Sequence, residues 1–309
     1  MSNSASSTTG AISASEHAQI QRANVSGLHP VVFVHGLWLL AGSWERWAEV
    51  FEAAGYIALM PDWPGDPATV AEANANPDAM ANQTVGQVVD HLAAVIGRLE
   101  RRPIVVGHSF GGLLAQILAG RGLAAVTVAI DPAPFRGVLP LPLSALKASW
   151  PVLGNPANRN RAVPLSYEQF RFAFANAVDA QEAQQLYRSY AVPAPGAPLF
   201  QAATANINPW TEAQVDTTNQ ERGPLLIVSG EKDHTVPWAI ANASFRQQQV
   251  NPGLTEIVQM PVRGHSLVID SGWREVADTA LAFVRRFATA DVFESAYLFN
   301  EEEDRRVAA

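Results

Sequence analysis

The chain has 309 residues, of which 48% are hydrophobic and 16% are charged, so it is long and apolar enough to bury a full core. Its formal net charge is -8, which argues against nucleic acid or an anionic membrane surface as a partner. The absence of cysteine excludes disulfides, a thiolate nucleophile and cysteine-ligated metals.

The first 28 residues are rich in Ser, Ala, Thr and Asn, and they lack the charged start and apolar core of a secretory signal. We therefore expect residues 1–28 to be a disordered tail. No apolar run approaches the roughly 18 residues that a membrane span needs. These features favour a cytoplasmic protein, with neither nucleic acid nor membrane as partner.

Strand and helix signals alternate along most of the chain. Short apolar runs bounded by turn residues predict strands at residues 31–34, 56–60, 103–106, 124–130, 224–229 and 254–260. Apolar residues at helical spacing predict helices at residues 43–54, 84–100, 111–119, 238–249 and 272–287. The stretch 61–82 is rich in Pro, Asp and Asn and predicts a long loop. This alternation predicts an α/β fold, with a mostly parallel central sheet and helices on both faces.

The pattern changes between residues 134 and 222, where prolines are frequent and helical stretches occur without strand signals. We expect a helical cap here, inserted after the strand that follows the Ser109 motif described below. Ligands of open parallel sheets bind beyond the carboxyl ends of the strands, so a lid over a binding site is favoured over a packing elaboration. The core then comprises residues 29–133 and 223–290, and residues 291–309 form an acidic tail.

The motif Gly107-His108-Ser109-Phe110-Gly111 lies between a predicted strand and a predicted helix. G-x-S-x-G in that context is typical of a nucleophile elbow, a turn so tight that small residues must flank the serine. We expect the Ser109 hydroxyl to be a nucleophile and the Phe110 N–H to face a developing oxyanion. The N–H of Leu37, at the end of the first strand, fits a second oxyanion donor.

A serine nucleophile needs a base and a carboxylate that orients the base. His265 follows the last predicted strand and is the favoured base. Asp233 follows the strand that ends at Ser229 and is the favoured acid, with Asp131, at the end of the strand after the elbow, as the alternative. We expect His108 to support the turn rather than to move protons.

Together these residues resemble the α/β-hydrolase superfamily, in its lid-bearing serine esterase and haloperoxidase-like branch, from about residue 30 to residue 287. The chain order Ser109, Asp233, His265 is the order of that family. The resemblance implies the α/β-hydrolase fold with a cap. It also implies an acyl-serine mechanism that uses this triad, with Leu37 and Phe110 as oxyanion donors and no cofactor or metal.

Two features depart from the family pattern. The first two strands of the family have no evident counterpart before Pro30, so we expect a shorter sheet or one without its antiparallel edge. The loop that usually reads Gly-x-Gly near the fourth strand reads Gly65-Asp66-Pro67 and then runs long.

Aromatic side chains near the expected site could line an apolar pocket; they are Trp38, Trp63, Phe135 and Trp150. The leading hypothesis is hydrolysis of a carboxylic ester or lactone of an apolar or aromatic small molecule. Carbon–carbon bond hydrolysis, perhydrolysis or acyl transfer with the same triad is an alternative. A ligand-binding receptor on a hydrolase scaffold is another, because fold does not imply function.

Overall fold

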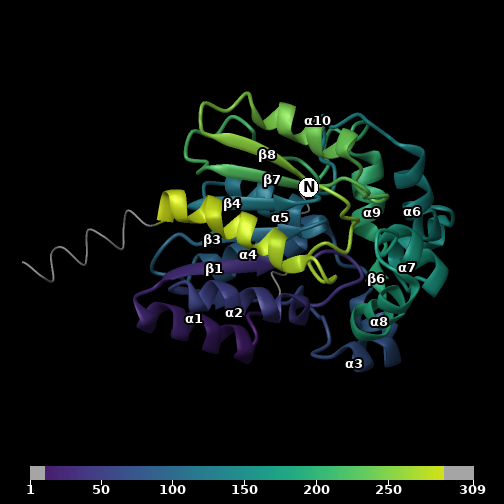
Figure 1. The fold of residues 1–309 in the computed structure, drawn as a ribbon, viewed down its shortest axis with the longest axis horizontal. Helices are drawn as coiled ribbons and strands as arrows, with labels where there is room; N and C mark the ends of the chain where they lie inside the picture. The colour runs from purple at the N-terminus through teal and green to yellow at the C-terminus, as the bar shows by residue number, and fades with distance from the viewer. Residues whose placement is uncertain (1–10, 289–309) are drawn as a thin grey trace, which may run out of the picture.

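A six-stranded sheet forms the centre of the molecule in a computed structural model that describes residues 11–288 (Figure 1). Its strands lie in the order β2-β1-β3-β4-β7-β8, and every pair is parallel. Their bounds are β1 His29–Val34, β2 Tyr56–Leu59, β3 Ile104–His108, β4 Val126–Ile130, β7 Leu225–Gly230 and β8 Thr255–Met260. The predicted parallel sheet is confirmed, and among the described residues no strand precedes β1.

Helices cover both faces of this sheet, as buried parallel strands require. The core helices are α2 Glu45–Ala53, α4 Val85–Ile96, α5 Phe110–Gly120, α10 Trp238–Gln248 and a final helix at residues 273–288. The final helix, yellow in Figure 1, crosses in front of the sheet, and α4 and α5 lie behind it. It packs beside α2, where the Arg46 guanidinium lies 4.7 Å from the centre of the Trp273 ring.

The expectation of a disordered N-terminal tail is wrong for residues 14–26, which form helix α1 (Ala14–Ser26). Ser13 and Glu16 form a capping box at its start, and Glu16 also lies 2.7 Å from His91 Nε2 of α4. Ile20 and Ala23 are buried in the core. Because few residues of this helix are apolar and buried, its composition resembles that of a disordered tail. Residues 1–10 and the acidic tail at 291–309 lie outside the described residues.

The stretch predicted as a long loop contains two short helices, α3 Val70–Ala75 and the 3₁₀ helix η2 Pro77–Met80. Thr69 caps α3 by accepting a hydrogen bond from the Glu72 N–H at 3.2 Å. This segment is therefore folded against the core, with Ala73 and Met80 buried.

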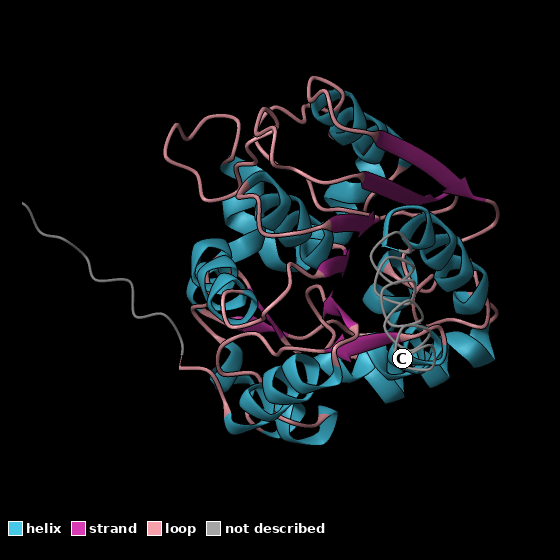
Figure 2. Ribbon diagram, turned by 90° about the vertical axis from the view of Figure 1, so that its left-hand side faces the viewer, coloured by secondary structure: helices cyan, strands magenta, loops and turns pink. Residues whose placement is uncertain are grey.

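A mostly helical insertion separates β4 from β7. Its helices are α6 Leu143–Leu153, η3 Pro156–Asn160, α7 Tyr167–Ala173, α8 Ala180–Tyr190 and α9 Ala197–Thr204. A two-residue antiparallel pair, β5 Ala162–Val163 with β6 Ala194–Pro195, was not anticipated from the sequence. These helices lie together at one end of the sheet, on the right in Figure 1. Figure 2, seen from another side, shows the helices around the sheet.

Candidate functional site

Ser109 occupies the sharp turn between β3 and α5, in a backbone conformation that non-glycine residues rarely adopt (φ 57°, ψ -121°). The flanking glycines are required by close packing. A Cβ at Gly107 would lie 2.0 Å from the Gly111 carbonyl oxygen, and a Cβ at Gly111 would lie 2.0 Å from that of Val34. The turn therefore holds Ser109 at the carboxyl end of the sheet, where the sequence placed it.

A chain of hydrogen bonds links Ser109, His265 and Asp233. Ser109 Oγ lies 3.0 Å from His265 Nε2, and His265 Nδ1 lies 2.6 Å from Asp233 Oδ2. All three side chains are buried. The loops after β7 and β8 supply Asp233 and His265, so residues from three separate segments meet at one end of the sheet. With Nδ1–H donating to Asp233, Nε2 is free to accept the Ser109 hydroxyl proton.

The Asp233 carboxylate is held by its own loop. Its Oδ1 accepts hydrogen bonds from the N–H groups of Thr235 and Val236, at 2.6 and 2.8 Å. Burial alone would raise the pKa of Asp233. The charge and hydrogen bond of His265, with the other donors around the carboxylate, outweigh burial and lower that pKa. Asp233 is therefore an anion beside the imidazole.

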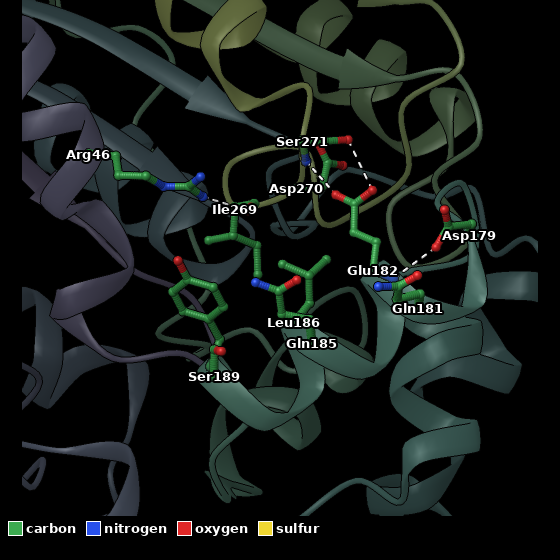
Figure 3. A pocket seen from close by; sticks show the side chains of 11 residues that line it. Arg46, Asp179, Gln181, Glu182, Gln185, Leu186, Ser189, Ile269, Asp270 and Ser271 are labelled. Carbon is green, nitrogen blue, oxygen red and sulfur yellow. Dashed lines mark hydrogen bonds between the residues drawn. The ribbon is translucent and has the colours of Figure 1, made fainter.

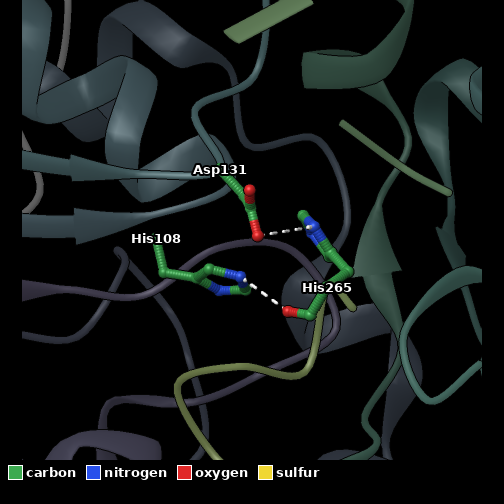
Figure 4. A group of neighbouring side chains, drawn as sticks. All are labelled: His108, Asp131 and His265. Carbon is green, nitrogen blue, oxygen red and sulfur yellow. Dashed lines mark hydrogen bonds and ion pairs between the residues drawn. The ribbon is translucent and has the colours of Figure 1, made fainter. Parts of the chain in front are cut away.

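The alternative acid, Asp131, lies in the same cluster (Figure 4). Its Oδ1 accepts the Gly230 N–H at 2.8 Å, and its Oδ2 lies 4.0 Å from His265 Nδ1. Complete burial and the neighbouring Asp233 raise the pKa of Asp131 well above its ordinary value. The structure thus brings both candidate aspartates to His265, and only Asp233 is within hydrogen-bond distance of it.

The His108 side chain lies beside His265 and points toward its backbone carbonyl (Figure 4). Its Nε2 lies 2.9 Å from the His265 carbonyl oxygen, and the two rings are 4.7 Å apart. Burial, followed by the charge of His265, lowers the pKa of His108 well below its ordinary value, so it is neutral and donates to that carbonyl. Potential metal ligands of His108, Asp131 and His265 lie within 4.8 Å of one another, but both His265 nitrogens are already hydrogen bonded.

The loop after β1 packs directly against the elbow. A Cβ at Gly36 would lie 2.8 Å from Ser109 Cβ and 3.3 Å from the Phe110 nitrogen. Among the described residues, neither the Leu37 N–H nor the Phe110 N–H donates to another protein group. The backbone N–H groups of Leu37 and Phe110 therefore remain available as donors, and Leu37 directly follows the glycine that packs against Ser109.

A cavity of about 210 Å³ opens on Ser109. Apolar side chains from the cap and from the loops after β4 and β7 line most of it, and no charged residue among the described ones lines it. Among its residues are Leu139, Leu141, Leu146, Leu199, Val236 and Ile240. Sequence reasoning missed these aliphatic residues, because aliphatic side chains in a cap have no signal that separates pocket lining from core.

The four aromatic residues expected in the pocket have different places. Trp38 lines the cavity, and its indole N–H donates to the Val163 carbonyl at 3.0 Å. Trp63 does not line the cavity. Its ring stacks on that of His35, with 5.4 Å between the ring centres, and so packs against the loop after β1. Phe135 is buried in the core, and Trp150 is 68% exposed on the outside of α6. For these three, the pocket assignment is wrong.

A second cavity, of about 400 Å³, lies between cap helix α8 and the core (Figure 3). Glu182 of α8 accepts hydrogen bonds from Ser271, from the N–H at 2.5 Å and from the hydroxyl at 3.0 Å. Arg46 of α2 donates to the Ile269 carbonyl at 2.5 Å. The Glu182 bonds attach α8, and the Arg46 bond attaches α2, to the segment that follows His265. Ser109 does not line this cavity.

Residues 31–279 match the sequence model of the alpha/beta hydrolase family, which is most of the chain. The chain is an α/β-hydrolase. The match runs from β1 into the final helix and includes Ser109, Asp233 and His265.

Solved structures with this fold have low sequence identity to this α/β-hydrolase. An extracellular alpha/beta-hydrolase from a Paenibacillus species is 19% identical over 82% of this chain and 98% of its own, with a TM-score of 0.61. A monoacylglycerol lipase from Paleococcus ferrophilus is 20% identical over 84% and 94% of the two chains (TM-score 0.56). A pyrethroid hydrolase from Sphingobium faniae is 17% identical over 82% and 96% (TM-score 0.56).

At this identity the likeness shows the fold alone. A search of curated proteins finds no match to the chain. In the described part of the α/β-hydrolase, no helix is both long and apolar enough to cross a membrane.

Proposed function

We propose that this α/β-hydrolase is a serine hydrolase that cleaves a carboxylic ester or lactone of an apolar or aromatic small molecule. The observation that carries the proposal is the continuous hydrogen-bonded chain from Ser109 through His265 to Asp233, with separations of 3.0 and 2.6 Å. Nucleophile, base and orienting carboxylate each have the partner that acyl transfer needs.

In the acylation step, Ser109 Oγ attacks the carbonyl carbon while His265 Nε2 takes the hydroxyl proton. Asp233 holds the ring through Nδ1 and stabilises the imidazolium. His265 then gives the proton to the leaving alcohol oxygen, and the acyl-serine remains. In deacylation, His265 removes a proton from water, the hydroxide attacks the acyl carbon, and the proton returns to Ser109 as the acid leaves.

The negative charge that develops on the substrate oxygen needs donors that are already in place. The N–H groups of Leu37 and Phe110 are the candidates, because both flank Ser109 and neither donates elsewhere among the described residues. Each such donor contributes about 10²-fold or more to the rate in serine hydrolases of known mechanism.

The cavity supports an uncharged, apolar substrate. No charged side chain lines it, so a carboxylate or phosphate on the substrate would lose its hydration without gaining a partner. Leu139 and Leu141 line it and are also exposed to solvent, so the mouth is apolar as well. A monoacylglycerol lipase and a pyrethroid hydrolase have the same fold, which is compatible with ester hydrolysis by this chain.

The direct test is intact-mass spectrometry after exposure to a fluorophosphonate, which an activated serine attacks with loss of fluoride. We expect one adduct on the wild type and none on Ser109→Ala. Ser149→Ala is the matched control, because Ser149 lines the same cavity but its hydroxyl donates to the Ala145 carbonyl at 2.8 Å.

Labelling should be followed by a screen of uncharged aryl and alkyl esters and lactones, with product analysis by mass. Ester turnover that disappears in Ser109→Ala and persists in Ser149→Ala supports the proposal. The proposal is overturned if the adduct persists in Ser109→Ala. It is also overturned if folded wild type neither reacts with the fluorophosphonate nor turns over any ester.

A further inference from the structure

Asp131 and Asp233 come from the ends of the neighbouring parallel strands β4 and β7. Both side chains are buried, and both face the same nitrogen: His265 Nδ1 lies 2.6 Å from Asp233 Oδ2 and 4.0 Å from Asp131 Oδ2. The Asp131 Oδ1 accepts the N–H of Gly230, the last residue of β7. Its Oδ2 accepts no hydrogen bond from a donor in the described residues.

Two buried carboxylates that share one histidine repel each other, so one of them carries a proton. The negative charge is better stabilised on Asp233, because it accepts two backbone N–H groups and pairs with His265. Among the described residues, Asp131 accepts one backbone N–H, and its other oxygen, Oδ2, lies 4.0 Å from His265 Nδ1.

The other titratable groups around Asp131 favour the same arrangement. His108 is neutral, so it places no positive charge near Asp131, and the Asp270 carboxyl opposes the ionisation of Asp131. Burial and Asp233 raise the pKa of Asp131, whereas the pKa of Asp233 is lowered. A proton on Asp131 therefore gives Asp233 one more hydrogen-bond donor.

We propose that Asp131 is a neutral carboxylic acid that donates a hydrogen bond to the Asp233 carboxylate. When residue 233 carries no charge, as in Asp233→Asn, Asp131 ionises and its carboxylate stabilises the His265 ring instead. In the wild type, Asp131 is a positioning residue, acting through Asp233. The catalytic part of this proposal rests on the proposed function, because it concerns the same histidine.

The chain offers matched variants for the test. In Asp131→Asn, the amide oxygen accepts the Gly230 N–H and the NH₂ group donates to Asp233, so kcat should stay within about threefold of the wild type. Asp131→Leu makes neither bond and should lower kcat more than tenfold. Rescue by asparagine but not by leucine is expected for a neutral donor and not for an anion.

The decisive comparison is a double-mutant cycle. In Asp233→Asn, Asp131 lies next to His265 without a competing negative charge. Asp131 therefore ionises, and the variant enzyme retains part of the activity. The double variant Asp131→Asn/Asp233→Asn has no anion there and should lose about 10⁴-fold in kcat. We expect the asparagine at 131 to cost at least tenfold more in the Asp233→Asn background than alone.

The pH dependence separates this role from a structural one. Activity of Asp233→Asn should rise with pH as Asp131 ionises, and the double variant should lose that rise. Equal costs of Asp131→Asn in both backgrounds, or a loss in Asp131→Asn as large as in Asp233→Asn, would overturn the proposal. Circular dichroism and thermal unfolding confirm that each variant is folded.

An activity-independent measurement keeps this proposal distinct from the proposed function. Isotope-edited infrared spectroscopy of the protein with ¹³C-labelled aspartate should show the carbonyl band of a protonated carboxylic acid at neutral pH, absent in Asp131→Asn. The band would persist even if no ester were turned over. Its absence from the wild type overturns the proposal, whether or not the protein labels with fluorophosphonate.

Discussion

His35 Nε2 lies 3.1 Å from Asp66 Oδ2, and both side chains are almost fully buried behind the loop that carries Leu37. His35 Nδ1 is 3.0 Å from the Gly36 carbonyl oxygen, and the Trp63 indole donates to the His35 carbonyl at 3.2 Å. Burial alone would lower the pKa of His35, but Asp66 outweighs it and the pKa is raised. This pair therefore supports the loop that packs against Ser109 through Gly36.

Asp66→Asn should destabilise the protein by about 3 kcal/mol, because breaking a buried pair leaves its partner without compensation. The raised pKa of His35 sets the pH dependence. Its stabilisation is fully present below the unfolded-state pKa of about 6.5 and is lost as pH rises through the higher folded-state value. Urea unfolding should therefore show a larger difference from wild type at pH 6 than at pH 9. A difference that grows with pH would contradict a charged His35.

Asp62→Asn should have the opposite effect. Burial, opposed in part by His35, raises the pKa of Asp62 from 3.8 to about 6. The folded state then holds its proton more tightly than the unfolded state, so wild-type stability falls as pH rises from about 4 to 6. Asp62→Asn removes this penalty and should gain on the order of 1 kcal/mol at pH 8, after allowance for partial exposure. Urea unfolding at pH 8 and pH 4 checks this, because the gain should vanish at pH 4.

Gly36→Ala should lower kcat by about 10²-fold with a smaller change in KM, because the added Cβ displaces the Leu37 N–H from the oxyanion position. That Cβ would lie 2.7 Å from the His108 carbonyl oxygen and 2.8 Å from Ser109 Cβ. Gly42→Ala is the control, since its nearest contact is an ordinary 3.6 Å to a Glu45 carboxylate oxygen. Steady-state kinetics on one ester should give a lower kcat for Gly36→Ala than for Gly42→Ala. Equal kcat values would contradict the role of the Leu37 N–H as an oxyanion donor.

Leu146→Arg should lower kcat/KM for a bulky apolar ester by about tenfold, because Leu146 lines the cavity and a guanidinium there must remain hydrated. Leu143→Arg is the matched control on the same helix. Leu143 is 84% exposed and does not line the cavity, whereas Leu146 is 37% exposed. Kinetics with one bulky ester and one acetate ester would show whether the loss depends on substrate size. A similar loss in both variants would place the acyl group elsewhere.

Local patterns in the sequence determined the sheet, the elbow and the identity of the residues near it. β-branched runs specify buried strands, and the steric demand of the turn around Ser109 leaves only small residues at its flanks, so both can be predicted from neighbouring residues. The positions of Asp233 and His265 after predicted strands also followed, because carboxyl ends of parallel strands meet at one edge of a sheet.

Tertiary structure decided everything that depends on distance between remote segments. It put Asp131 and Asp233 side by side, placed Asp66 against His35, and turned Trp150 outward while Leu146 lines the cavity. Helix α1 shows the same limit, since a polar segment folds when a few contacts such as Glu16 with His91 dock it. Which residues meet, and therefore which carboxyl group holds a proton, is set by packing across the whole chain rather than by local pattern.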